Sequence, residues 1–382
     1  MHALQLYAGP AARRHIAQHG LLPQHVATLP AAAGGPKGLI LGPLDRFIFG
    51  QWLPQSSQPV DLVGASIGAW RMAAACLDDP AAAFQKLETG YIHGDMKAPP
   101  GRKLPLPEQV SATFGDNLRA MFDGHVPTIL THPRYRLHVL ASRGRHVLGR
   151  EGRWRTAAGY LGAALTNAAS RRAMGAWLER VVFSRADATG QPAALPFATR
   201  DYRTRHVTLT ADNFYPALQA SGSIPFVLKA VHDIPGAPRG AYWDGGITDY
   251  HLHLAYTASD SIAARADAAG ATGQFDANPS PGGQLVLYPH FQRAVVPGWL
   301  DKGLKWRHGA THYLNHMLVL APNPEWLRTL PGGKLPDRTD LQRLGHPERV
   351  QAWTTAVQAA GQLADEFEAW LRRPDAAQVQ AL

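Results

Sequence analysis

The sequence predicts an α/β fold in which a central, mostly parallel sheet is flanked by helices. Strand, glycine-rich turn and helix follow one another twice within residues 25–77, which is the order of a parallel sheet covered on both faces. Hydrophobic residues make up 45% of the 382 residues, which is enough for a large core. No apolar run approaches the roughly 20 residues of a membrane span, and no N-terminal signal pattern is present. We therefore expect a cytoplasmic protein.

The individual elements are predicted from hydrophobic periodicity and from glycine and proline positions. Strands are expected at residues 25–29, 60–63, 136–142, 207–210 and 284–288. Helices are expected at 11–19, 39–49, 67–77, 157–180 and 213–220, with one long amphipathic helix at 347–373. The remaining assignments are a lead-in before residue 11, a loop with one helix at 95–130, and a flexible insertion at 257–283. We expect residues 1–330 to form one domain, and residues 331–382 a helical extension packed on it.

Charge and cysteine content narrow the functional classes. The net charge is +9, but the arginines are dispersed, with no long basic block and no nucleic-acid-binding motif. We expect a solvated basic surface, with an anionic interface as the alternative and no nucleic-acid partner. The single cysteine, Cys76, lies in an apolar stretch and is expected to be a buried structural thiol. One cysteine allows neither an intramolecular disulfide nor a cysteine-based zinc cage.

A serine stands at the centre of a G-x-S-x-G motif, Gly64-Ala65-Ser66-Ile67-Gly68. In this pattern the serine occupies a sharp strand-to-helix turn, whose strained backbone exposes the hydroxyl group. Gly64 and Gly68 are small because the chain approaches itself closely there. The predicted strand before the motif and helix after it supply the required context. Ser66 is therefore a candidate nucleophile, and a structural glycine turn is the alternative.

Two further glycine motifs carry possible chemistry. The loop Gly34-Gly35-Pro36-Lys37-Gly38 follows the strand expected at residues 25–29 and could present backbone N–H groups to a developing oxyanion. It is not a phosphate-binding Walker loop, because the lysine precedes the last glycine. In Asp244-Gly245-Gly246 the small residues could let the carboxylate sit at a loop tip and act as a base, if apolar enclosure raises its pKa. A simple turn is the alternative for either motif.

In the order glycine loop, G-x-S-x-G and Asp-Gly-Gly, the chain resembles the patatin-like phospholipase family over about residues 24–250. The segment 217–227 (ALQASGSIPFV) is also similar to the family's Ala-Ser-x-x-x-Pro stretch. In one departure, Ala32 and Ala33 stand where the family loop usually has aspartate and glycine.

The resemblance implies a three-layer patatin-like fold and a serine acyl hydrolase that cleaves fatty-acyl esters of phospholipids or other lipids without a cofactor. It implies a Ser–Asp dyad in which Ser66 is the nucleophile and Asp244 the base. The oxyanion loop would then contain Gly34, Gly35 and Gly38, with Lys37 at its basic position. Gly64 and Gly68 would form the nucleophile elbow, and Gly245 and Gly246 would support the aspartate.

Two other functions remain open at this stage. An ordinary α/β-hydrolase would use a Ser-His-Asp triad, and histidines are plentiful after Ser66: His251, His253, His290, His308, His312 and His316. A protein that kept the fold but lost catalysis would bind lipid or act as a scaffold. The spacing of the last three histidines permits a metal site, but no acidic residue completes it, so we expect an exposed helix surface and no metal.

The segment 299–308 (WLDKGLKWRH) combines tryptophans with basic residues. A plain surface loop is the first expectation, and contact with lipid headgroups through the aromatic rings and positive charges is the alternative. A transient contact with a membrane surface is accordingly one interpretation, which would make the protein peripheral to a membrane.

Overall fold

The computed structural model describes residues 1–95, 99, 105–256 and 285–382. It is an α/β structure with a mostly parallel central sheet flanked by helices, as the sequence predicts. The sheet has eleven strands, nine of them in the order β13-β1-β12-β11-β2-β3-β4-β5-β7, while β9 pairs with β4 and β8. The strands are β1 (Leu4–Ala8), β2 (Val26–Ala31), β3 (Val60–Ala65), β4 (Tyr135–Gly144), β5 (Leu178–Arg185), β7 (Thr204–Leu209), β8 (Val231–His232), β9 (Ala241–Asp244), β11 (Leu285–Pro289), β12 (Met317–Pro322) and β13 (Val379–Ala381).

The centre of the sheet is parallel, from β12 through β11, β2 and β3 to β4. The antiparallel pairs in the described sheet are β1 with β12, β5 and β9 with β4, and β8 with β9. A separate two-stranded sheet joins β6 (Phe197–Ala198) and β10 (Ala255–Tyr256). Because β2 and β3 are parallel neighbours, the loops that follow them leave the sheet at the same edge.

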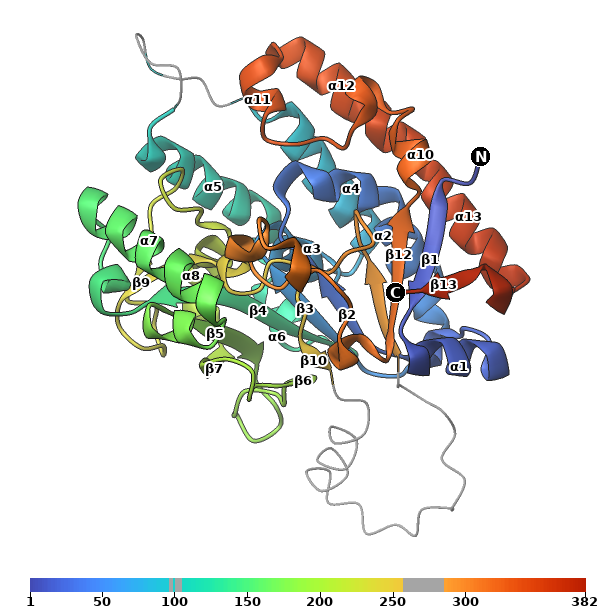
Figure 1. Cartoon of the computed structure of the whole chain (residues 1–382), viewed down its shortest axis with the longest axis horizontal. Helices are drawn as coiled ribbons and strands as arrows, with labels where there is room; N and C mark the ends of the chain where they lie inside the picture. The colour runs from blue at the N-terminus through green and yellow to red at the C-terminus, as the bar shows by residue number, and fades with distance from the viewer. Residues whose placement is uncertain (96–98, 100–104, 257–284) are drawn as a thin grey trace.

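Helices cover the sheet and one another (Figure 1). Among the described residues, the α-helices of five residues or more are α1 (Pro10–His19), α2 (Gly42–Phe47), α3 (Ile67–Ala74), α4 (Pro80–His93), α5 (Pro107–Phe122), α6 (Val126–Leu130), α7 (Arg153–Ala169), α8 (Ala211–Gly222), α12 (His346–Ala359) and α13 (Gly361–Arg372). Helix α13 packs on α2 and β1, and α12 packs on α4. Both α13 and α1 contact β1.

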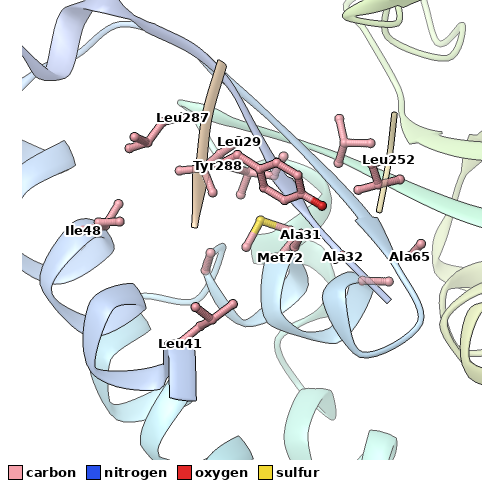
Figure 2. Packing of buried hydrophobic residues seen from close by; sticks show 14 of the residues in the cluster. Leu29, Ala31, Ala32, Leu41, Ile48, Ala65, Met72, Leu252, Leu287 and Tyr288 are labelled. Atoms are coloured by element: carbon pink, nitrogen blue, oxygen red, sulfur yellow. The ribbon is translucent and has the colours of Figure 1, made fainter. Parts of the chain in front are cut away.

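The main core lies between the central strands and the helices that cover them. Figure 2 shows Met72 of α3 near the ring of Tyr288 and near Ala31, at the end of β2. Cys76 is fully buried, as expected, and burial raises its thiol pKa to about 12. No helix in the described ranges has the length and hydropathy to cross a membrane.

The extension expected at residues 331–382 packs on the rest of the chain. The ring of Phe367 in α13 lies edge-on to Phe47 and Trp52, at centroid distances of 6.1 Å and 5.8 Å. Strand β13 joins the main sheet beside β1. Residues from both sides of position 330 therefore share one core cluster.

Several predicted boundaries are wrong. The lead-in contains β1, and the helix expected at 157–180 ends at Ala169, after which residues 178–185 form β5. The Val181-Val182-Phe183 run favours a strand. In the sheet, this strand lies between β4 and β7, which are separated from it in the sequence. Residues 105–130 hold two helices, α5 and α6, instead of one.

Two predicted helices are also not single continuous α-helices in the structure. The helix expected at 347–373 is divided at Ala360 into α12 and α13. The helix expected at 39–49 consists of a 3₁₀ segment η2 (Gly35–Leu41), then α2, then the π-helical turn η3 (Ile48–Trp52). The insertion expected at 257–283 lies outside the described residues.

Candidate active site

Ser66 lies at the turn between β3 and α3, where it is the residue before the first helical position. Its backbone has φ 58° and ψ −130°, which is rare for a residue with a side chain. Such a conformation costs about 1–3 kcal/mol and persists only where the surroundings enforce it. The first N–H groups of α3 have no partner inside the helix, so a partial positive charge lies beside the serine.

Gly64 and Gly68 enforce the turn by close packing. A Cβ on Gly68 would lie 1.9 Å from the carbonyl oxygen of Ala31, so the start of α3 rests directly on the end of β2. A Cβ on Gly64 would lie 2.4 Å from the Cα of Ala69. Both positions therefore require glycine, as the G-x-S-x-G interpretation predicts.

The backbone of Ser66 is held by a residue from a distant helix. Its N–H donates to Oγ of Ser221 in α8 at 2.9 Å, and Ser221 donates in turn to the carbonyl of Leu140 in β4 at 2.6 Å. Ser221 lies in the segment 217–227 that resembles the patatin-like stretch, but the sequence assigned it no role. Because the Ser66 N–H is bonded in this way, it is not a free donor for a substrate oxygen.

The register of β4 explains why Asp244 meets Ser66. Strand β3 runs parallel to β4 and ends with Ala65 opposite Leu140. Strand β9 runs antiparallel to β4 and ends with Asp244 opposite Ala141, the next residue along. Strand β5 occupies the other edge of β4 along the same stretch. The carboxyl ends of β3 and β9 therefore meet on one edge of β4.

Ser66 Oγ donates a hydrogen bond to Asp244 Oδ2 at 2.7 Å, across 178 residues of sequence. The other carboxylate oxygen, Oδ1, accepts the N–H of Gly246 at 2.7 Å, which fixes the orientation of the carboxylate. Both side chains are buried. Burial raises the pKa of Asp244 above its ordinary value, and the bond from Ser66 and the nearby Arg338 partly oppose the shift.

Gly245 and Gly246 allow this loop to lie against two neighbours. A Cβ on Gly245 would lie 2.1 Å from the carbonyl oxygen of Leu140, and a Cβ on Gly246 would lie 2.5 Å from the Cβ of Ala33. The second contact brings the aspartate loop against the glycine loop. Both glycines are thus required by packing.

A buried ion pair anchors the chain just after Asp244. Asp249 accepts two bonds from Arg180 of β5, at 2.8 Å and 2.6 Å, and its own N–H bonds to the carbonyl of Gly245 at 2.9 Å. Arg180 is fully buried. The position of the Asp244 carboxylate therefore depends on β5, an element that the sequence analysis missed.

The glycine loop is only partly directed at the serine. Gly34 and Lys37 line the cavity that contains Ser66, whereas Gly35 and Gly38 line a smaller neighbouring cavity of about 30 Å³. Gly35 has φ 58°, which favours glycine, and a Cβ on Gly34 would lie 2.6 Å from the ring of Phe291. Gly34 immediately precedes η2, whose first N–H groups lack partners inside the helix. The Ala33 N–H is committed to the carbonyl of Tyr250 at 3.0 Å.

The cavity around the dyad has a volume of about 240 Å³. Besides Ser66 and Asp244 it is lined by Ala33, Gly34, Lys37, Gly246, Tyr250, Trp299, Lys302, Asp337, Arg338 and Thr339. Arg338 and Tyr250 belong to no sequence motif, and the sequence did not indicate them. Trp299 and Lys302 lie in the segment 299–308, which was singled out for possible lipid contact and not as part of this cavity.

The histidines after Ser66 are engaged elsewhere. His253 bonds through Nδ1 to the carbonyl of Val295 at 2.8 Å, and His290 bonds through Nδ1 to the carbonyl of Gln292. Nδ1 of His251 lies 3.1 Å from the N–H of Val296. Within the described residues, no histidine hydrogen-bonds to Ser66 or Asp244.

The expected helix surface for the last three histidines is wrong. His308 follows the 3₁₀ turn η9 (Lys305–Arg307), His312 begins another (His312–Leu314), and His316 precedes β12. They share no helix, so their regular spacing has no structural meaning. In the part of the chain that is described, no three histidine, cysteine, aspartate or glutamate residues are placed to hold a metal ion.

Comparison with models of known protein families finds no match, and comparison with functionally curated proteins finds no significant similarity. The chemistry of the site is therefore argued from its geometry. A buried carboxylate of raised pKa bonds to a strained serine hydroxyl at the start of a helix. Such an arrangement can remove a proton from the serine and hold a negative oxygen beside it.

Proposed function

We propose that the chain is a serine acyl hydrolase of the patatin-like type, which cleaves a lipid acyl ester through a Ser66–Asp244 dyad. The observation that carries the proposal is the 2.7 Å bond from Ser66 Oγ to Asp244 Oδ2 inside a lined cavity. A serine used only for structure would not need a left-handed backbone at the start of a helix. The resemblance of the three glycine motifs to the patatin-like family points to the same chemistry.

In the first half of the reaction, Ser66 Oγ attacks the acyl carbonyl carbon while Asp244 accepts the hydroxyl proton. The carbonyl oxygen becomes negative and takes N–H donors at Gly34 and at the start of α3. The C–O bond to the alcohol then breaks, and Asp244 returns its proton to the departing alkoxide oxygen. The product is an alcohol and an acyl-serine.

In the second half, Asp244 accepts a proton from water as the water oxygen attacks the acyl-serine carbonyl. The bond between the acyl carbon and Ser66 Oγ breaks, the proton passes from Asp244 to Oγ, and a carboxylic acid leaves. One base, Asp244, therefore serves both halves of the reaction, and no third catalytic residue is needed.

The test combines a serine-directed fluorophosphonate with hydrolysis of p-nitrophenyl and lipid esters. We expect Ser66→Ala to abolish labelling, and Ser66→Ala and Asp244→Asn each to lower kcat/KM by about 10³-fold or more. Exposed matched controls, Ser170→Ala and Asp212→Asn, should retain wild-type rates. Circular dichroism must show that each variant is folded.

Other outcomes would support the competing functions. Loss of activity in His251→Asn or His253→Asn, with Asp244→Asn still active, would replace the dyad by a triad. A folded wild-type protein that neither labels nor turns over any ester in the panel would indicate a catalytically silent lipid-binding protein.

A further inference from the structure

Positive charge gathers around the dyad from three separate segments. Lys37 comes from the glycine loop, Lys302 follows the 3₁₀ turn η8 (Trp299–Asp301), and Arg338 precedes α11 (Asp340–Arg343). All three side chains line the cavity that contains Ser66. Segments so far apart in sequence would not place like charges together unless something compensates for the repulsion.

The carboxylates nearby offset that repulsion only in part: Asp337 and Asp244 act to raise the pKa values of Lys37 and Lys302, but both pKa values stay below the ordinary range. Asp337 also lines the cavity, but it pairs with Lys334 at 2.8 Å. Asp301, next to Lys302, is buried and pairs with Arg307 at 2.9 Å. Asp244 is the remaining carboxylate of the cavity lining, and it is bonded to Ser66.

Lys302 shows the effect of this crowding. Burial, together with the charges of Lys37 and Arg338, lowers its pKa to about 8, although part of the side chain is exposed. Its Nζ lies 4.0 Å from the ring centroid of Tyr250 and 5.1 Å from that of Trp299, so two aromatic faces hold the ammonium at the cavity. A bound anion would relieve the repulsion and restore the charge.

We propose that Lys302 and Arg338, together with Lys37, bind a phosphate group carried by the substrate next to the ester that Ser66 attacks. The inference rests on the proposed function and names its substrate class, an acyl ester with an adjacent phosphate. Arg338 brings a planar donor fork suited to phosphate oxygens, and the two lysines add point charges.

The first arm of the test measures binding without turnover, by calorimetry with decyl phosphate, decanol and inorganic phosphate. We expect decyl phosphate to bind at least tenfold more tightly than decanol, and Lys302→Met and Arg338→Gln to remove most of that difference. The exposed neighbour Lys305→Met is the matched control. Tight binding of inorganic phosphate alone would show that the site takes the free ion; equal binding of decyl phosphate and decanol would overturn the proposal.

The second arm compares kcat/KM for a monoacylglycerol phosphate and the corresponding monoacylglycerol. We expect a ratio above ten in the wild type, falling towards one in Lys302→Met and Arg338→Gln. Turnover of both esters at equal rates would reject the phosphate site and leave the hydrolase intact. Binding of decyl phosphate without turnover of either ester would reject the hydrolase and leave the phosphate site intact.

A different observation concerns the outer face of α7. Trp154, Leu161 and Leu165 are 80%, 63% and 65% exposed, and their spacing of seven and four places them on one side of the helix. The opposite side is buried and small: Thr156, Gly159, Ala163 and Asn167. The helix therefore packs closely through its small residues and turns its large apolar residues outwards.

Two neighbouring segments carry further exposed aromatic side chains. Phe226, which is 59% exposed, approaches Tyr160 of α7 at a ring distance of 6.4 Å. Trp306, which is 73% exposed, adjoins Arg307, and Arg307 bonds to the carbonyls of Asn167 and Ala168 at the end of α7.

The charges on α7 itself have one sign. Residues 152–177 contain no aspartate or glutamate. Exposed cations stand at both ends of α7 and beside Trp306: Arg153, Arg155, Arg172 and Lys305. An apolar helix face with tryptophans and flanking cations is complementary to an anionic lipid surface. A protein partner would more often be met by mixed charges at the rim.

We infer that the outer face of α7, with Trp306 and Phe226, docks on an anionic lipid surface. The same segment that carries Trp306 also carries Trp299 and Lys302 of the cavity lining, so docking would bring the cavity close to lipid headgroups. This places the lipid contact mainly on α7, and only in part on the segment 299–308.

Vesicle sedimentation tests the docking face independently of catalysis. We expect the wild type to bind vesicles of phosphatidylcholine with 30% phosphatidylglycerol, and the double variant Leu161→Ser/Leu165→Ser to bind at least tenfold less. Raised salt should weaken binding. Leu22→Ser, at another exposed leucine, is the control. Equal binding by wild type and double variant would overturn the inference, as would a dimer in ultracentrifugation that the double variant abolishes.

Discussion

Burial sets the protonation behaviour of Asp244. As the proposed base it must be ionised, and its pKa lies above the ordinary 3.8 because the carboxylate is buried. We therefore expect kcat/KM for a neutral ester to fall as the pH drops through this raised pKa, at a pH above 3.8. Chromatographic measurement of product across the pH range checks this, and activity that stays level down to pH 4 would contradict it.

Acid unfolding must be distinguished from this loss of activity. Because the folded state holds the Asp244 proton more tightly than the unfolded state, protonation of this group favours folding between pH 3.8 and its raised pKa. The pKa of Asp337 is lowered to about 2 by Lys334 and Thr339, despite its burial, so the stability from that pair is lost only below about pH 4. Buried histidines act in the opposite direction: the pKa of His290 is lowered to about 3 and that of His206 to about 4, so the fold loses stability as the pH falls below 6.5. Circular dichroism at each pH therefore accompanies the rates, and the activity limb is assigned to Asp244 where the spectrum is unchanged.

Contact between elements decides which glycines are essential. We expect Gly68→Ala to force α3 away from β2, because its Cβ would meet the carbonyl of Ala31 at 1.9 Å. Labelling of Ser66 by a fluorophosphonate should then slow by tenfold or more. Gly90→Ala in α4 is the matched control: nothing lies within 4 Å of its Cβ, and it should stabilise the fold by about 0.5–1 kcal/mol. Normal labelling of Gly68→Ala would show that the elbow tolerates a shift.

The elements that the sequence predicts well are those whose signals are local. The strand before Ser66 and the helix after it both follow from short-range pattern and glycine spacing, as do α1 and α8. Strand β1 could not be found in this way, because its strand character depends on partners at the far end of the chain. Strand β5 was not predicted, because the alanine-rich helix before it was expected to continue to residue 180.

The candidate site likewise contains some residues that sequence motifs identify and others that only the structure identifies. Ser66, Asp244 and the glycines around them carry motifs, and the structure brings the two side chains together. Arg338 carries no motif, and Lys302 lies in a segment singled out only for possible lipid contact, because tertiary folding alone places both at the cavity. Ser221 lay inside a recognised stretch, yet its bond to the Ser66 N–H needs coordinates to be seen.

For the whole molecule, the question is whether residues 331–382 stabilise the rest. Phe367 is fully buried against Phe47 and Trp52, so its truncation leaves a cavity between the extension and α2. We expect Phe367→Ala to lower the free energy of unfolding by about 3–5 kcal/mol, measured by urea unfolding. Leu341→Ala, at an exposed position of the same extension, should change it by less than about 0.5 kcal/mol. A small effect of Phe367→Ala would mean that the extension folds as a separate unit.

The pairing of Leu4 with Pro322, and of Leu6 with Val379, has a consequence for biosynthesis. A ribosome adds about 5–20 residues per second, so the first strand waits roughly 15–60 s for β12 to emerge. During that interval its unpaired edge is open to wrong partners. Arg338 also emerges late, so a nascent chain can hold the serine and aspartate well before the cation that lines their cavity. For the proposed hydrolase, this order would disfavour ester cleavage by an incomplete site, and we expect chaperones to bind the unpaired β1 during synthesis.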